Sequence, residues 1–377
     1  MSASPPTVLL FGGTLLALDG TFRTLDDAEI LLSGGRVAAV GRALTALPGT
    51  NFLDITGCLV LPGLVLPHAP LSRTLFHSAA DGDALEAAHD DDSAHVAALT
   101  GGVACLLRGI TTVRDLGTVA GIDGHLAGLH ESGIHAYTGP VFADADDLPS
   151  GLRTDADDVA GSLERFDQAL ARLGDATLIH PLLQLRHADR ASAALCQRVA
   201  EAADARHQQL HAQLTAAADD QAVRQRLAAL DAGSLTFGHE QPAARPDDLP
   251  QLAEPLAYAH AAVRAAKADP SGRDVLAEAT RQGVAGLGLQ SEAGTVEVGR
   301  RADLVIVRRS DPSLWTDEPV DLHDAVAHGL SRADVRHVFV AGHHRVNEGK
   351  LANVDQAALR ERAQHALAAV RERRAAQ

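Results

Sequence analysis

Aromatic residues, basic clusters and cysteines are all scarce in this sequence. Only 3% of the 377 residues are aromatic, so a core must be built from aliphatic side chains. The formal net charge is −16 and no basic run offsets it, which argues against nucleic-acid binding because that depends on neutralising phosphates. Cys58, Cys105 and Cys196 are odd in number and widely spaced in apolar surroundings, as expected of reduced, buried thiols.

The sequence also lacks the segments that direct proteins into or across membranes. Residues 1–6 show no basic stretch followed by an apolar one. No run reaches the roughly 18 uncharged apolar residues that a membrane span needs. We therefore expect a cytoplasmic protein that contacts neither a membrane nor nucleic acid. With 46% hydrophobic residues, the chain can form one large core and a smaller second domain.

The chain does contain a β-rich start and end around a middle in which strands and helices alternate. Short β-rich runs occupy the first 60 residues, with a hairpin signal at Gly34-Gly35, and apolar strands return at 303–307 and 337–340. Between them, six apolar runs alternate with Ala-rich helical segments, which is typical of a parallel sheet or barrel. The six predicted strands are 63–66, 111–114, 136–142, 177–185, 209–213 and 234–238.

This organisation predicts an α/β protein with an incomplete TIM-type barrel and a small β-sandwich. Residues 1–60 and 291–355 are predicted to form the sandwich together, because neither end has enough strands to bury a face alone. Residues 61–290 are predicted to form the barrel, and 356–377 a charged, Ala-rich helix. Residues 240–273 read as a Pro-rich loop followed by a helix, so barrel strands 7 and 8 are predicted to be missing.

Four segments, in the same order, resemble the amidohydrolase superfamily of metal-dependent hydrolases. They are LPGLVLPHAPL at 61–71, GITTVRD at 109–115, GTVEVGRRADLV at 294–305 and VRHVFVAG at 335–342. The third is the most specific, and the branch they resemble is that of triazine hydrolases and nucleobase deaminases. The resemblance spans nearly the whole chain. It implies hydrolysis or deamination of C–N bonds by a divalent metal that lowers the pKa of a bound water.

Most of the metal-binding positions that this resemblance implies are not kept, so the chain reads as a degenerate, shortened relative. The family's first strand ends in a His-x-His pair, which here reads His68 and Pro70, and proline offers no side-chain donor. On strand 5, the gap-free alignment places Gln213 on a metal histidine and Ala216 on the catalytic Glu. A two-residue slip would instead place His211 on the metal position, again without the acid. The strand 5 register therefore stays open.

Two further histidines match family positions. His239 ends an apolar strand, as the family's strand 6 histidine does. His187 lies over a substrate-binding histidine, and a surface or loop position explains it equally well. The family's metal-binding Asp on strand 8 has no counterpart. The resemblance thus predicts a vestigial pocket of His68, His187, His211 and His239, with no intact catalytic set.

Three functions are compatible with this pattern. The combined losses favour a pseudoenzyme, a non-catalytic subunit or scaffold with no cofactor. A residual hydrolase acting on C–N bonds of a cyclic amide, triazine or nucleobase-like substrate would hold one zinc or iron ion with His68, His211 and His239. It would lack a general base, which contributes about 10²–10⁴-fold in rate. A metal-free small-molecule binding protein is the third.

The missing strands also predict a partner. An open sheet edge exposes unpaired backbone groups that native proteins cover. We therefore expect a homo- or hetero-oligomer, and a catalytic amidohydrolase is one candidate partner.

Overall fold

The computed structural model describes residues 5–46, 48–76, 81–118, 120–146, 148–174, 178–215, 225, 256–267, 269–308 and 321–376, and the backbone course alone of 235–239. The chain divides into two compact units. The first comprises Met1–Pro67, Val103–Val113 and Pro250–Val354, and the second comprises His68–Gly102, Arg114–Leu249 and Asp355–Gln377. The predicted helix at 219–229, apart from residue 225, and the predicted loop at 240–255 lie outside the described residues.

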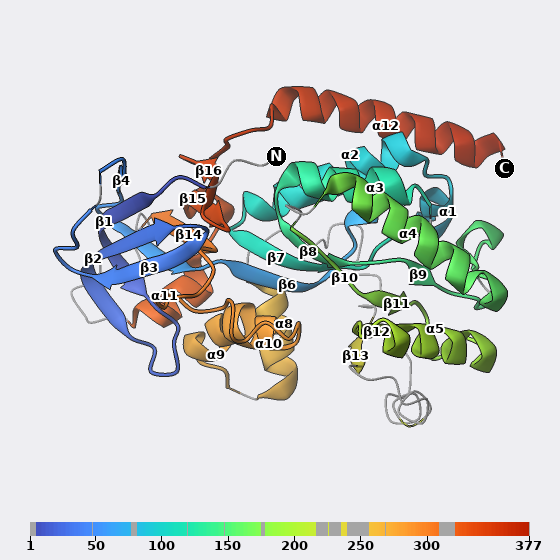
Figure 1. Ribbon diagram of the computed structural model, residues 1–377, viewed down its shortest axis with the longest axis horizontal. Helices are drawn as coiled ribbons and strands as arrows, with labels where there is room; N and C mark the ends of the chain where they lie inside the picture. Colours follow the sequence, from blue (N-terminus) through green and yellow to red (C-terminus); the bar gives the residue numbers. More distant parts are fainter. Residues whose placement is uncertain are drawn as a thin grey trace. The chain divides into compact units, whose positions relative to one another are not determined.

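The first unit contains one nine-stranded sheet to which both ends of the chain contribute (Figure 1). Its strands are β1 (Val8–Leu16), β2 (Thr24–Ser33), β3 (Arg36–Gly41), β4 (Asn51–Asp54), β5 (Cys58–Pro62), β14 (Leu304–Arg308), β15 (Val335–Val340), β16 (His343–Asn347) and β17 (Lys350–Leu351). β5 pairs antiparallel with β14, which joins the two β-rich regions. The hairpin at Gly34-Gly35 is confirmed, and both glycines have the positive φ that this tight turn requires.

One buried cluster in the first unit is built from alternate residues of these strands. Leu10 of β1, Ile30 of β2 and Ile306 of β14 are among its fully buried members. Residues 8–16 form the single strand β1. The glycines at 12 and 13 cause a register irregularity there without ending the strand.

The first unit also contains the helices that follow the proposed deletion. They are α8 (Ala257–Ala266), α9 (Gly272–Ala277), α10 (Gly283–Ala285) and α11 (Leu322–Gly329), with a π-helical turn at Glu278–Gln282. α8 confirms the helix predicted at 258–267. In the part of 240–273 that the structure describes, there is helix and no strand.

Parallel strands alternate with helices through the region predicted to form the barrel. The strands are β6 (Leu64–Ala69), β7 (Ile110–Asp115), β8 (His135–Thr138), β9 (Val141–Phe142), β10 (Ile179–Pro181), β11 (Leu183–Leu185), β12 (Leu210–Leu214) and β13 (Leu235–His239). The helices are α1 (Gly82–Ala87), α2 (Asp91–Leu106), α3 (Ile122–Ser132), α4 (Val159–Leu173) and α5 (Ala193–Ala205). The strands form two four-stranded sheets, in the orders β10-β8-β7-β6 and β13-β12-β11-β9.

All six predicted strands occur in these sheets, but two of them are divided. The run at 136–142 forms β8 and β9, and the run at 177–185 forms β10 and β11. Pro140 lies at the first break and Pro181 at the second. Proline has no N–H to donate to the ladder, so each run is interrupted at this point. The two runs still pair with each other on both sides of the break and in the same register, β8 with β10 and β9 with β11.

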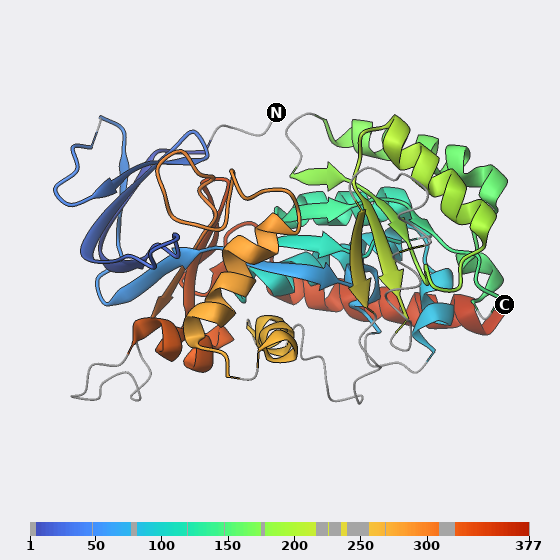
Figure 2. The ribbon, with the colours of Figure 1, turned by 90° about the horizontal axis from the view of Figure 1, so that it is seen from below.

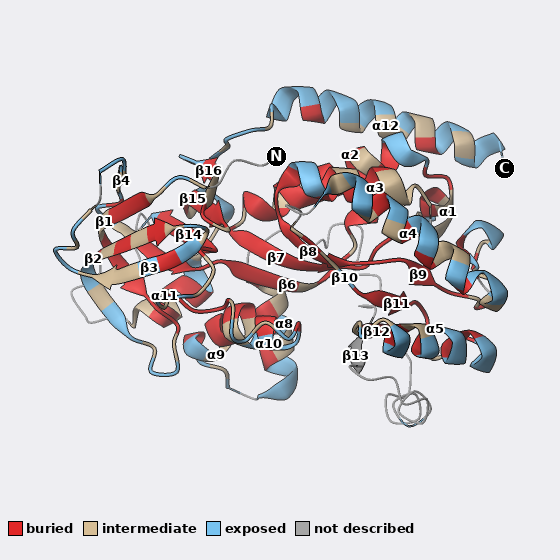
Figure 3. Ribbon diagram, in the orientation of Figure 1, coloured by how far each residue is buried: buried red, intermediate tan, exposed pale blue. Residues whose placement is uncertain are grey.

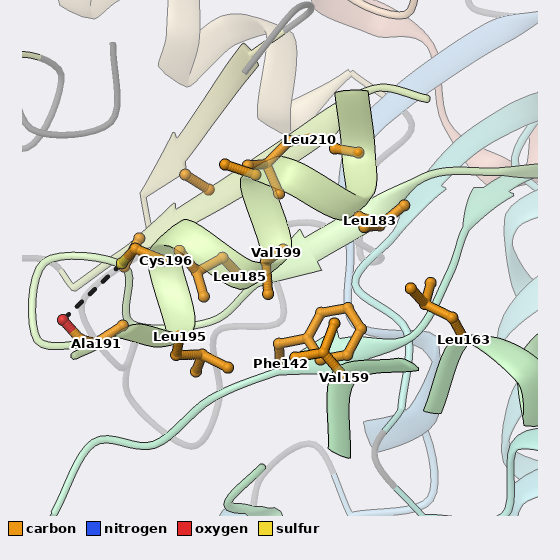
Figure 4. Close-up of a cluster of buried hydrophobic side chains, with 14 of the residues drawn as sticks. Phe142, Val159, Leu163, Leu183, Leu185, Ala191, Leu195, Cys196, Val199 and Leu210 are labelled. Carbon is orange, nitrogen blue, oxygen red and sulfur yellow. Dashed lines mark hydrogen bonds between the residues drawn. The ribbon is translucent and has the colours of Figure 1, made fainter. Parts of the chain in front are cut away.

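α5 packs along β11 and β12 in the second unit (Figures 2 and 4). Leu195 and Val199 of α5 and Leu210 of β12 belong to one fully buried cluster. Consecutive residues of a strand point to opposite faces. Burying Leu210 against α5 therefore turns His211 and Gln213 to the other face of β12, which is the interior side of a barrel sheet.

The predicted C-terminal helix is α12 (Gln356–Ala376), which is exposed along most of its length (Figure 3). Its Val370 packs in a buried cluster with Phe76 and Leu85. Near its end, Arg373 forms an ion pair with Asp90 at 2.8 Å. Neither α12 nor any other helix in the described part of the chain is long and apolar enough to cross a membrane.

A buried carboxylate, that of Glu86 in α1, joins three segments of the second unit. It accepts hydrogen bonds from Arg186 Nη2 at 3.1 Å, Arg73 Nε at 2.9 Å and Ser72 Oγ at 3.3 Å. Burial alone would raise the pKa of Glu86, but the charges of Arg186 and Arg73 outweigh it and lower this pKa to about 2. Glu86 is therefore ionised at neutral pH, and its guanidinium partners compensate its buried charge.

Gly63, which joins β5 to β6, has no room for a side chain. A Cβ at this position would lie 2.8 Å from Thr111 Cβ in β7. We expect Gly63→Ala to lower the free energy of unfolding by about 1–3 kcal/mol, measured by chemical denaturation. Gly20→Ala is the matched control, because nothing lies within 4 Å of its added Cβ. Equal stability of the two variants would contradict this packing.

Glu86 should make the free energy of unfolding depend on pH within a defined range. Its folded pKa of about 2 lies below the ordinary value of 4.5, so its contribution is complete above pH 4.5 and is lost as the pH falls towards 2. This difference corresponds to about 3 kcal/mol. We expect Glu86→Gln to be less stable at pH 7 and to lose less further stability between pH 5 and 2 than the wild type does. Exposed Glu164→Gln should keep the wild-type profile. A Glu86→Gln profile parallel to wild type would refute this role.

Candidate functional site

The carboxyl ends of the parallel strands carry several of the predicted site residues, and this is the edge at which barrel enzymes place their active sites. His68 lies near the end of β6, and His211 and Gln213 lie on β12. All three are buried in the second unit. His187 follows β11 and is also buried, with a φ of +49°. It is therefore a buried loop residue.

The structure describes little of the side chains at three other predicted positions. Pro70 is half-buried and directly precedes the short 3₁₀ turn Leu71–Arg73. Ala216 lies outside the described residues. The backbone of His239 pairs with Leu214 at the end of β13, and its side chain lies outside the description.

Arg114, near the end of β7, contacts His211. Its Nη1 lies 3.3 Å from His211 Nδ1, and both side chains are buried. Burial lowers the pKa of His211 well below its usual value, and the charges of Arg114 and His68 lower it further. The imidazole is therefore neutral at pH 7, and its Nδ1 accepts a hydrogen bond from the guanidinium.

Asp115, the next residue along β7, holds the turns after β6 and β7 in place through hydrogen bonds. Its completely buried carboxylate accepts hydrogen bonds from His125 Nε2 at 2.7 Å and Thr138 Oγ1 at 2.6 Å. It also accepts from the backbone N–H groups of Gly117 at 3.0 Å and Leu71 at 3.2 Å. These donors satisfy the buried carboxylate, so Asp115 acts as a structural anchor for the turns after β6 and β7.

Two buried amides, Gln184 of β11 and Gln213 of β12, lie side by side. Gly139 O can only accept, so Gln184 directs its Nε2 to it at 3.4 Å. Gln184 Oε1 must then accept from Gln213 Nε2, at 3.2 Å. This order leaves Gln213 Oε1 as a buried acceptor with no hydrogen-bond partner among the described residues. Gly117 makes this packing possible, because a Cβ there would lie 2.6 Å from Gln184 Nε2.

The described donors do not fit the metal that the family resemblance implies. Catalytic zinc takes three protein ligands, mainly His, Asp, Glu or Cys. Pro70 offers no donor, Gln213 is bonded to Gln184, and the fixed charge of Arg114 lies against His211. Within the described ranges, no group of three or more His, Cys, Asp or Glu side chains could hold a metal ion. The positions that this structure describes thus form a hydrogen-bonded polar interior.

Sequence reasoning missed the charged residues that organise this interior: Glu86, Arg114, Asp115 and Arg186. Two of them, residues 114 and 115, belong to the quoted motif GITTVRD, and residue 186 directly precedes His187. An Arg on a run that is otherwise apolar was the available signal, because its stem must enter the interior. Glu86 gave no such signal, since it is one of several acids in an Ala-rich segment.

Known proteins that resemble this chain include several deaminases. No protein-family model matches it. A 5-methylthioadenosine/S-adenosylhomocysteine deaminase from Desulforudis audaxviator is 26% identical over 87% of this chain and 91% of its own length. A protein of the same name from Syntrophobacter fumaroxidans is 38% identical over 84 residues, which are 22% of this chain and 19% of that relative. The stronger identity thus spans only about a fifth of that relative.

Solved structures match the fold over almost the whole chain. An adenosine deaminase from Xanthomonas campestris with bound zinc gives a TM-score of 0.77 at 19% identity, covering 98% of this chain and 99% of that one. An atrazine chlorohydrolase from Arthrobacter aurescens gives a TM-score of 0.74 at 18% identity, covering 96% and 100%. At such identities the structures establish the α/β, TIM-barrel-type fold. The deaminase relative that spans most of the chain and these structures support the resemblance to the amidohydrolase superfamily, in its deaminase and triazine hydrolase branch.

Proposed function

We propose that this chain is a non-catalytic member of the superfamily, a pseudoenzyme whose interior no longer supports metal-dependent hydrolysis. The contact between Arg114 Nη1 and His211 Nδ1, at 3.3 Å, carries the proposal. A guanidinium stays charged at all physiological pH values and cannot bind and activate water as a metal ion does. Arg114, a cation that belongs to the chain itself, therefore stabilises the polar interior.

The electrostatic cost of adding a metal supports the same conclusion. A cation held by His211 would lie within a few ångströms of the Arg114 guanidinium. At an effective dielectric of about 20, two like charges about 4 Å apart repel by about 4 kcal/mol for each unit of charge on the ion. Metal binding at His211 therefore requires Arg114 to leave, together with its hydrogen bond.

A second candidate is a hydrolase that still acts on C–N bonds, and the similar proteins favour it more directly. The deaminase relative aligns with 87% of the chain, and the zinc-bound deaminase structure with 98%. In this case His68, His211 and His239 would hold one zinc or iron ion. The substrate would be a cyclic amide, a triazine or a nucleobase-like ring. A residue other than Ala216 would have to supply the general base.

Metal content and turnover separate these candidates. We expect protein dialysed against zinc, then freed of excess ion, to hold well under one equivalent per chain by elemental analysis. We expect no turnover of adenosine, methylthioadenosine or atrazine above that of His68→Ala. His365→Ala, exposed on α12, is the control. One equivalent of zinc and measurable turnover, both lost in His68→Ala and kept in His365→Ala, would establish the hydrolase.

We further propose that a second copy of the chain completes the barrel. The sequence supplies six parallel strands where a closed barrel of this type has eight, and the described part of 240–273 is helical. Closure by another chain would remove the open edges. Light scattering at sub-micromolar concentration should give the mass of a dimer or a larger assembly. A monomeric mass at every concentration tested would contradict this arrangement.

A further inference from the structure

We propose that Arg186 and Gln213 form a binding site for a small organic carboxylate that carries an O–H or N–H donor beside the carboxylate group. The site lies at the carboxyl ends of β11 and β12, within the second unit. It requires no metal, so it goes beyond the loss of metal chemistry proposed above and does not depend on it.

Arg186 is held in place through Nη2 of its guanidinium, and the other N–H groups take no part in that contact. Its side chain is 3% exposed, and its Nη2 lies 3.1 Å from both carboxylate oxygens of Glu86. Its Nε and Nη1 have no hydrogen-bond partner among the described residues. Leaving a buried donor unsatisfied costs about 1–3 kcal/mol, and more for a charged group. The described part of the chain therefore offers these N–H groups no acceptor, and we assign that role to a bound ligand.

The local charges favour an anionic acceptor. Glu86 pairs with both Arg186 and Arg73, and Asp83 also pairs with Arg73, so the charges of these two arginines and two acids balance. Arg114 adds another fixed positive charge beside His211. His211 lies on the same strand and the same face as Gln213. Guanidinium groups bind carboxylates through charge-assisted hydrogen bonds, which are about twice as strong as neutral ones.

The nearest acid on the following loop does not supply this acceptor. Asp189 accepts from Thr215 Oγ1 at 2.6 Å and from the Thr215 backbone N–H at 2.9 Å. These bonds lower the pKa of Asp189 against the effect of its burial, so it is ionised and committed to the end of β12. Arg186 is left with Glu86 as its ion-pair partner.

Gln213 supplies the second half of the site. The parallel register Gln184↔His211 and Leu185↔Ala212 continues to place Arg186 beside Gln213. Gln213 Oε1 can only accept, so it selects a ligand with an O–H or N–H group. The pair therefore matches hydroxy acids and N–H-bearing carboxylates, which present an acceptor and a donor close together.

The test compares three probes of one size: lactate, propionate, which lacks the hydroxyl, and lactamide, which lacks the charge. We expect lactate to bind more tightly than propionate, and lactamide most weakly, in titrations followed by calorimetry or ligand-observed NMR with a chelator present. Arg186→Lys keeps a positive charge beside Glu86 but removes the free N–H groups. It should weaken lactate binding by about tenfold or more. Gln213→Met should reduce lactate to the affinity of propionate and leave propionate unchanged.

Arg198→Gln, on the exposed face of α5, is the matched control and should bind lactate as the wild type does. Thermal melting of each variant verifies that it is folded. Equal lactate affinity in Arg186→Lys and wild type would overturn the proposal, as would equal binding of lactate and lactamide, or no lactate binding at millimolar concentration. The chelator keeps these outcomes independent of metal. A wild type that binds zinc and turns over substrate would overturn the proposed function alone.

Discussion

A charge can be buried only where hydrogen bonds or a counter-charge compensate it, and for the guanidinium of Arg186 the counter-charge is that of Glu86. Its carboxylate connects α1 to Arg186 at the end of β11 and to Arg73 after β6. Truncating Glu86 would leave the buried Arg186 guanidinium without its counter-charge, whereas Arg73 would keep Asp83. Removing one partner of a buried ion pair costs several kcal/mol in measured cases. The position of Arg186, and with it the carboxylate site proposed for that residue, depends on this single side chain.

Periodicity in the sequence was sufficient to predict the strands and helices, but not which distant residues pair with one another. Apolar runs predicted all six parallel strands, because burial on both faces leaves a clear signal. The breaks at Pro140 and Pro181 were missed, since a proline on a strand removes one hydrogen bond without changing hydrophobicity. His68 lies near the end of its strand, whereas His211 is the second residue of β12. The pairing of Arg186 with Glu86 could not be predicted, because it joins segments 100 residues apart.

The fold and the site have been conserved to different degrees relative to the proteins that this chain resembles. A core keeps its architecture when apolar residues of similar total volume replace one another, so the fold persists at 18–19% identity. A metal centre tolerates no such exchange, because each ligand must supply a specific donor. In the gap-free alignment, Pro70 and Gln213 would alter that donor set without disturbing a strand. Likeness of fold is therefore weaker support for chemistry than the side chains at the strand ends.

The pairing of β5 with β14 has a kinetic consequence. These neighbouring strands contain Cys58 and Arg308 as partners, so the chain between them must be made before the sheet can form. Contacts between residues so distant in sequence slow folding, because a long loop must close before any stabilising contact is gained. During synthesis on the ribosome, β5 would keep the edge that pairs with β14 unpaired until β14 emerges. Chaperones that shield exposed strands should therefore matter most to this protein in that interval.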